Sequence, residues 1–169
     1  MNAYAHVMLF RLALELAVAC AVVVALPPVR PLPAALACSL AAGVCVALAA
    51  ARRLPNPADL RGVTTRRFVP ALYLSLRAFA EETLWRGLVF GLALPRLGLV
   101  PAAALSLIGF VLIHVPGQGR FALVHLLTGA AFLTCYLTSG LWAAVLAHVA
   151  YNLTCLTLAP LQRRALRPT

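Results

Sequence analysis

Apolar residues fill this chain in six long runs, separated by short segments rich in proline, glycine or arginine. The runs cover about residues 3–26, 34–51, 68–94, 101–115, 121–138 and 141–158. A membrane-spanning helix needs about 20 predominantly apolar residues, and the runs are of that order. The pattern predicts an all-α fold, a polytopic membrane helix bundle with about six transmembrane helices.

The composition supports lipid as the surroundings of this chain. Of its 169 residues, 63% are hydrophobic, and the mean hydropathy is +0.96, whereas a soluble domain is about half apolar. The formal net charge is +10, and all 14 basic residues are arginine. These arginines flank apolar runs instead of forming a surface stripe, so we expect the lipid bilayer as a partner and no nucleic acid.

The arginines also predict an orientation. With six spans, the linker 52–67, the turn 116–120 and the C-terminal tail lie on one side of the membrane. That side holds nine arginines: Arg52, Arg53, Arg61, Arg66, Arg67, Arg120, Arg163, Arg164 and Arg167. The other side holds Arg30 and Arg96, so the positive-inside rule predicts that both termini are cytoplasmic. The absence of lysine and the abundance of alanine favour a bacterial protein of the inner membrane.

Two adjacent glutamates interrupt the third apolar run. Glu81 and Glu82 are half of the four acidic residues in the chain, and Arg77 and Arg86 flank them. A charge at the centre of a spanning helix costs about 2.5–3.5 kcal/mol on insertion scales. The four charges must therefore pair with one another and face a protein interior or a wet cavity, which is typical of an intramembrane functional site.

Three of the runs carry side chains that suit a catalytic site at i,i+4 spacing, which places each pair on one helix face. The pairs are Glu82 with Arg86, Phe110 with His114, and His148 with Asn152. Polar groups in lipid need internal partners, so we expect the three faces to converge. A carboxylate and an imidazole that share a water form a general base, and further donors can stabilise an oxyanion. The set suits amide hydrolysis without a side-chain nucleophile.

Three ordered motifs carry a family resemblance. Residues 81–86 fit EExxxR, Phe110 to His114 fits FxxxH, and His148 to Asn152 fits HxxxN. In this order they resemble the CPBP family (CAAX protease and bacteriocin-processing, or Abi), whose members are glutamic-type intramembrane endopeptidases. The resemblance covers about residues 69–159. It implies an enzyme that hydrolyses a peptide bond in a membrane-associated protein or peptide, with no metal and no cofactor.

The resemblance also implies a role for each matching residue. Glu81 and His114 would activate water, while His148 and Asn152 would support the oxyanion. Glu82 and Arg86 look like a supporting ion pair. Bacteriocin leaders, C-terminal sorting signals and other membrane peptides all remain open as substrates, and the oligomeric state is not readable from the sequence. Because His114 lies near the cytoplasmic end of its helix, we expect the site to open to that side.

The chain is expected to form one integrated membrane domain with three parts. Residues 1–67 would supply two transmembrane helices and a basic cytoplasmic linker. Residues 68–160 would form the catalytic helix core that resembles the CPBP family, and residues 161–169 a basic cytoplasmic tail. The five cysteines lie in apolar runs without metal-ligand spacing, so we interpret them as small buried residues.

Several alternatives stay open from the sequence. Phe121 to His125 also fits FxxxH; we prefer His114 and interpret His125 as structural. Arg77 lies four residues before Glu81 and could pair with it, which would weaken Glu81 as a proton acceptor. A metal-dependent protease would have to use a glutamate and two histidines as ligands. A non-catalytic member of the family, acting as a bacteriocin immunity factor or a scaffold, is the third alternative.

Overall fold

The computed structural model describes residues 3–25, 33–51 and 68–165, and in these ranges it is helical with no strand. This confirms the all-α prediction. The chain order is α1 (Ala3–Ala25), α2 (Pro33–Ala51), α4 (Phe68–Glu82), the π-helix η2 (Thr83–Phe90), α5 (Gly91–Leu97), α6 (Leu99–Leu112), α7 (Val115–Gln118), the 3-10 helix η3 (Gly119–Leu123), α8 (Val124–Ser139) and α9 (Leu141–Ala165).

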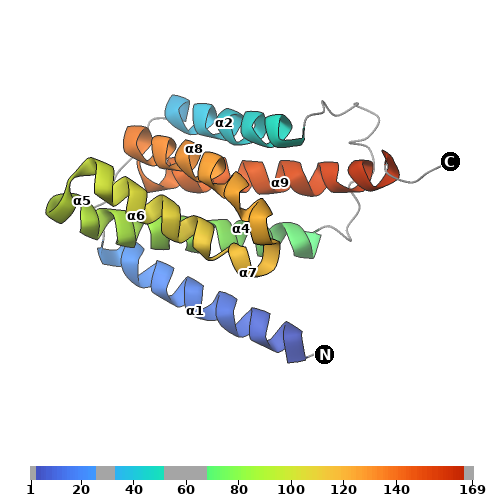
Figure 1. Cartoon of the computed structure of the whole chain (residues 1–169), viewed down its shortest axis with the longest axis horizontal. Coiled ribbons are helices and arrows are strands. Elements are labelled where there is room, and N and C mark those ends of the chain that lie inside the picture. The colour runs from blue at the N-terminus through green and yellow to red at the C-terminus, as the bar shows by residue number, and fades with distance from the viewer. Residues whose placement is uncertain (1–2, 26–32, 52–67, 166–169) are drawn as a thin grey trace.

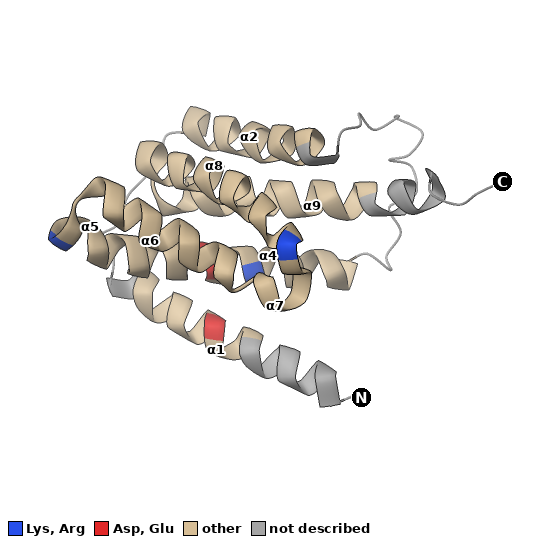
Figure 2. Ribbon diagram, viewed as in Figure 1, with Lys and Arg blue, Asp and Glu red and all other residues tan. Residues whose placement is uncertain are grey.

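The helices run side by side in a bundle with α9 near its centre (Figure 1). Helix α9 packs against α2, α4 and α8, whereas α6 packs against η2 and α8, and α1 packs against α4 and η2. The outer surface is apolar: Val69, Val100 and Leu127 are each more than 70% exposed. Figure 2 shows few charged residues along the coloured part of the ribbon. Such an exterior suits lipid contact.

Two glycine turns bring distant residues level with one another. Gly98 and Gly140 both have φ of +81°, a left-handed conformation that glycine adopts without steric cost. Each glycine reverses the chain between two helices. Glu81 and His114 lie at nearly equal sequence distances on either side of Gly98, and Phe132 and His148 lie at equal distances on either side of Gly140. The two turns therefore place the residues of each pair at similar heights along the bundle.

The third apolar run differs from its prediction in two ways. We expected one segment ending at Leu94, with residues 95–98 as the turn; instead the helix continues through Pro95 to Leu97, and the chain turns at Gly98. The boundary was wrong because Pro95 removes a single backbone donor near the helix end, while the left-handed conformation of Gly98 ends the helix. A π-helical stretch, which we did not predict, begins directly after Glu82.

The other helix boundaries lie within a few residues of the predicted runs, with two exceptions. The expected turn 116–120 is itself helical, in α7 and η3. Helix α9 continues past residue 158 to Ala165, so it includes part of the segment expected to be a tail. The linker 52–67, which carries five of the predicted cytoplasmic arginines, lies outside the described residues.

Two segments in the described ranges are long and apolar enough to cross a membrane, Val115–Ser139 and Leu141–Leu158. Shorter apolar helices cover Leu12–Val23, Pro33–Ala49 and Leu99–Leu112. The continuous helix from Phe68 to Leu97 is longer than any of these, about 45 Å at the α-helical rise, but it carries the central charges. Six spans with cytoplasmic termini stay a prediction.

Candidate active site

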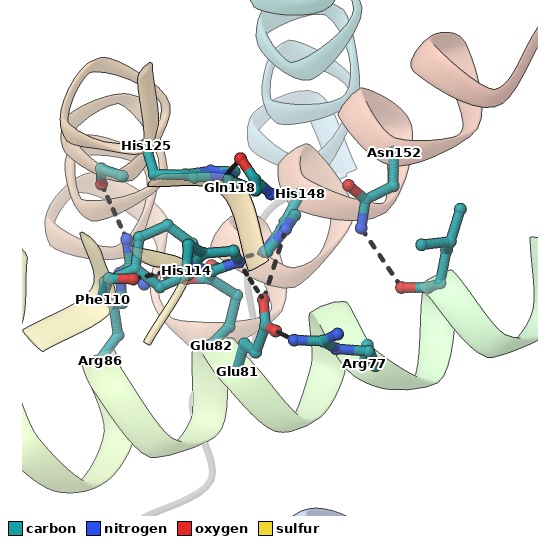
Figure 3. Close-up of polar contacts among 12 residues, drawn as sticks. Arg77, Glu81, Glu82, Arg86, Phe110, His114, Gln118, His125, His148 and Asn152 are labelled. Atoms are coloured by element: carbon teal, nitrogen blue, oxygen red, sulfur yellow. Dashed lines mark hydrogen bonds and ion pairs between the residues drawn. The ribbon is translucent and has the colours of Figure 1, made fainter. Parts of the chain in front are cut away.

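The Glu81 carboxylate lies between two imidazoles and a guanidinium (Figure 3). Its Oε2 is 4.0 Å from His114 Nε2 and 3.9 Å from His148 Nε2. Its other oxygen, Oε1, accepts a hydrogen bond from Arg77 Nη2. Glu81 is buried, at 5% exposure. One oxygen is thus held by a cation, and the other faces both histidines.

The His114 ring, in the turn that follows α6, bonds to the backbone of that helix. Its Nδ1 lies 2.8 Å from the Phe110 carbonyl oxygen. A carbonyl can only accept a hydrogen bond, so Nδ1 carries the proton, and in the neutral ring Nε2 then keeps its lone pair. The FxxxH spacing therefore directs a proton-accepting nitrogen toward Glu81.

Glu82 has a separate set of partners and is fully buried. Its Oε1 accepts a hydrogen bond from His148 Nδ1 at 2.8 Å. Its Oε2 lies 3.1 Å from Arg86 Nε; this is an ion pair outside hydrogen-bond angles, since neither atom has a hydrogen-bond partner. Adjacent helix residues point about 100° apart, so the two glutamates serve different neighbours.

Arg86 is fully buried and links three helices. Its Nη2 donates a hydrogen bond of 2.9 Å to the Gly129 carbonyl on α8, and its guanidinium carbon lies 4.5 Å from the centre of the Phe110 ring on α6. A Cβ at position 129 would lie 3.2 Å from Arg86 Nη2 and 3.0 Å from the Phe110 ring. Glycine at this position therefore allows the close approach.

The His148 ring packs against an aromatic partner from the neighbouring helix. Phe132 stacks on it with ring centres 4.5 Å apart and planes 18° apart. The edge of the Phe110 ring meets it from α6 at 5.9 Å. Together with the Glu82 hydrogen bond, these contacts fix the orientation of His148.

The sequence matches the model of a known protein family. A family model described as type II CAAX prenyl endopeptidase Rce1-like matches residues 65–154, just over half of the chain. The chain belongs to the Rce1-like family. The resemblance seen in the three sequence motifs is thereby confirmed. No curated protein and no solved structure matches the chain.

Membership assigns this Rce1-like chain to the CAAX protease-type peptidases, and hence to the hydrolases, at the level of the family. Together with the two long apolar helices, it also indicates a membrane protein. The matched region contains the whole polar cluster, from Arg77 on α4 to Asn152 on α9. Helices α1 and α2 lie outside it.

In this Rce1-like protein, the Asn152 side chain contacts the backbone of α4. Its Nδ2 donates a hydrogen bond of 3.3 Å to the Leu74 carbonyl on α4. In the described part of the chain, no hydrogen bond links it to Glu81, His114 or His148. The amide group has two N–H donors, so the bond to Leu74 leaves one of them for another acceptor.

The two FxxxH segments of the Rce1-like chain have different surroundings. Phe110 is fully buried and His114 faces Glu81, whereas Phe121 is 70% exposed. The His125 ring lies against the far side of His114, with ring centres 3.9 Å apart. His114 therefore lies next to the Glu81 carboxylate, and His125 contacts His114.

Three contacts in this Rce1-like site were not anticipated. They are the ring of Phe132, the carbonyl of Gly129 and the amide oxygen of Gln118, which accepts a hydrogen bond from His125 Nε2. The hairpin at Gly140 offered one sequence signal, because it brings Phe132 level with His148. Within the described residues, no group of three or more His, Cys, Asp or Glu has a metal-binding arrangement.

Proposed function

We propose that this protein is an intramembrane endopeptidase that hydrolyses a peptide bond with water activated by Glu81 and His114. The observation that carries the proposal is the position of one carboxylate oxygen, Glu81 Oε2, within 4.0 Å of two imidazole Nε2 atoms. Family membership supplies the reaction class, and the buried carboxylate and imidazoles supply groups suited to it.

The water would lie between Glu81 and His114. Both Glu81 Oε2 and the neutral His114 Nε2 are acceptors, so one water can donate a hydrogen bond of about 2.8 Å to each. Two such bonds are compatible with the 4.0 Å that separates the acceptors. They leave a lone pair of the water oxygen free to attack a carbonyl carbon. General-base assistance of this kind contributes about 10²–10⁴-fold in rate.

The chemical steps balance without a covalent enzyme intermediate. The water oxygen forms a bond to the carbonyl carbon while its proton passes to Glu81, and the carbonyl oxygen becomes an oxyanion. The carbon–nitrogen bond then breaks, and the proton held by Glu81 passes to the departing nitrogen. The products are a carboxyl group and an amine.

His148 and Asn152 would stabilise the oxyanion. Because His148 Nδ1 bonds to Glu82, its Nε2 can donate only when both ring nitrogens carry protons. In that doubly protonated ring, Nδ1 donates to Glu82 and Nε2 is left to donate to the oxyanion. The second N–H of Asn152 would add a neutral donor. Loss of one such donor typically costs about 2.7–4 kcal/mol of transition-state stabilisation.

The cofactor requirement, location, substrate class and accessibility of the proposed enzyme are inferred from the sequence. The enzyme would act without a metal or cofactor in the inner membrane of a bacterium, on a membrane protein or peptide. Its site would be accessible from the cytoplasmic side, where the predicted basic loops lie. Helix α7 and the beginning of α4 lie at the same end of the bundle as the end of α9 (Figure 1), which supports one common face for these segments.

Cleavage assays with a conservative substitution test the proposal. Purified protein in liposomes would be incubated with a library of membrane peptides, and new termini would be identified by mass spectrometry. We expect Glu81→Gln to abolish cleavage while its insertion and melting temperature stay close to those of the wild type. Thr134→Val, an exposed α8 residue, is the matched control. Full cleavage by the Glu81→Gln protein would exclude the proposed base and favour a non-catalytic role.

A further inference from the structure

His125, at the beginning of α8, lies against His114, and α7 and η3 form the turn between these two residues. The rings of His114 and His125 lie 3.9 Å apart, with 30° between their planes. Phe110 touches both rings with its own ring at steep angles, 65° to His114 and 85° to His125. The three rings form one packed group.

A hydrogen bond ties this group to the loop. His125 Nε2 lies 3.0 Å from Gln118 Oε1, and Gln118 is exposed whereas His125 is half-buried. Contacts therefore run from an exposed amide on α7 through His125 and His114 to the buried Glu81 (Figure 3).

The His114 ring needs a second contact to keep its orientation, because a single hydrogen bond does not prevent its rotation. One hydrogen bond, from Nδ1 to the Phe110 carbonyl, holds the ring, and rotation about the Cβ–Cγ bond of the side chain would break it. A flat partner at stacking distance opposes this rotation. Swinging the ring would move Nε2 away from Glu81 Oε2, which is already 4.0 Å distant.

We propose that His125 is a positioning residue, which with Gln118 keeps the His114 imidazole turned so that its Nε2 faces Glu81. This inference rests on the proposed function of Glu81 and His114. His125 would act through His114 and would not touch the substrate.

The stacked arrangement suits two neutral rings. Two imidazolium rings 3.9 Å apart would repel each other, because like charges at that distance interact unfavourably. The charged or titratable groups that act on His125 are His114, Glu81, His148 and Arg77. The anion of Glu81 lies beyond His114, so the His114 ring separates His125 from it.

A set of variants separates stacking from hydrogen bonding. His125→Phe keeps a flat ring and loses the bond to Gln118; Gln118→Leu loses the same bond and keeps the ring; His125→Ala loses both. We expect kcat to fall by about 10-fold to 100-fold in His125→Ala, as for other small displacements of catalytic groups, with KM nearly unchanged. His125→Phe should recover most of that loss. Leu127→Ala, on the exposed side of α8, is the control.

A spectroscopic readout tests the inference without any substrate. Nitrogen NMR of ¹⁵N-histidine protein should show His114 protonated at Nδ1 in the wild type and in His125→Phe. In His125→Ala the two tautomers of His114 should mix. A kcat of His125→Ala equal to that of the wild type, with an unchanged His114 signal, would overturn the inference. If His125→Ala fails to fold, Gln118→Leu decides it: a lower kcat with partly mixed His114 tautomers supports the inference, and wild-type values of both overturn it.

These readouts also separate two kinds of failure. Cleavage that survives in Glu81→Gln would contradict the proposed function, whereas the NMR signal of His114 would still report whether His125 orients it. A purely structural role for His125 predicts a lower melting temperature with an unchanged tautomer of His114.

Discussion

The Glu81 carboxylate faces His114 with 4.0 Å between Oε2 and Nε2, while its neighbour Glu82 contacts His148 and Arg86 instead. Two adjacent, chemically identical residues thus have different partners. The reason is helical geometry, since consecutive side chains point about 100° apart. The proposed division between a base and a structural anion follows from these partners.

Shortening Glu81 should reduce catalysis while substrate binding is retained. Glu81→Asp withdraws the carboxylate by one methylene from both histidines. Misplacement of a catalytic group by about 1 Å can cost about 10²-fold, so we expect a fall of that size in kcat and little change in KM. Initial rates over a range of peptide concentrations measure both constants, with Glu81→Gln as the inactive reference. An aspartate variant as fast as the wild type would contradict the general-base role.

Removing Glu82 should affect stability first. Glu82→Leu leaves the fully buried Arg86 without its anion, and breaking a buried pair in this way costs about 3–5 kcal/mol. The double variant Glu82→Leu with Arg86→Met removes both charges and should recover much of the loss. Thermal unfolding in detergent measures the melting temperatures of the two variants and of the wild type. Equal melting temperatures for Glu82→Leu and the wild type would show that the pair contributes little.

Arg77 should assist Glu81 by holding its second oxygen. Arg77 contacts Oε1 and leaves Oε2 to the histidines, so it orients the carboxylate without occupying the proposed water site. We expect Arg77→Met to lower kcat by about 10-fold, which is about 1.4 kcal/mol, and Arg77→Lys to retain more activity. The opposite result, a faster Arg77→Met enzyme, would mean that the cation competes with water for Glu81.

Chelators should leave the activity unchanged. The proposed mechanism assigns proton transfer to Glu81 and His114 and oxyanion stabilisation to protein donors. Cleavage rates are measured after incubation with EDTA and with 1,10-phenanthroline, using a known zinc protease as the positive control. Loss of cleavage that added zinc restores would replace this mechanism with a metal-dependent one, in which Glu81, His114 and His148 are the candidate ligands.

Close packing of α2 on α9 should make Gly43 sensitive to substitution. A Cβ at this position would overlap the carbonyl of Ala147, the residue before His148. Overpacking typically costs about 1–3 kcal/mol, so Gly43→Ala should lower the melting temperature. Gly91→Ala is the matched control, because its Cβ would lie 3.7 Å from the nearest atom, the Arg86 carbonyl oxygen, and alanine favours a helix by about 1 kcal/mol. A stabilised Gly43→Ala protein would argue against this helix contact.

The sequence alone predicted most of the fold because apolar runs and turn residues determine helices and turns through local interactions. Six apolar runs gave the helices, and the boundaries of most lie within a few residues of those observed. Two runs were exceptions: the helix of the sixth continues to Ala165, and the third differs in where it ends and in its helix type. Pro95 lies inside the helix and Gly98 ends it, and η2 widens the helix after Glu82. The Ser106 hydroxyl donates to the Trp85 carbonyl within that stretch, a contact between helices that no local pattern shows.

Only part of the candidate site could be predicted from the sequence. Solvation cost indicated that Glu81, Glu82 and Arg86 need buried partners, and the motif spacing pointed to His114 and His148. The spacing did not distinguish the two FxxxH segments, because Phe110 and Phe121 occupy equivalent positions in them. The difference between these phenylalanines is burial, which depends on how α6 and η3 pack in the bundle.

The sequence by itself determined the all-helical class, the membrane character and the family, since these follow from residue type and spacing along one chain. Only the tertiary structure decided which oxygen of Glu81 faces the histidines, that Arg77 holds the other one, and that Glu82 is shared by His148 and Arg86. The physical reason is that these partners come from α4, η2, α9 and the turn that follows α6. Their separations depend on helix rotation and on the Gly98 and Gly140 turns, to which contacts from many parts of the chain contribute.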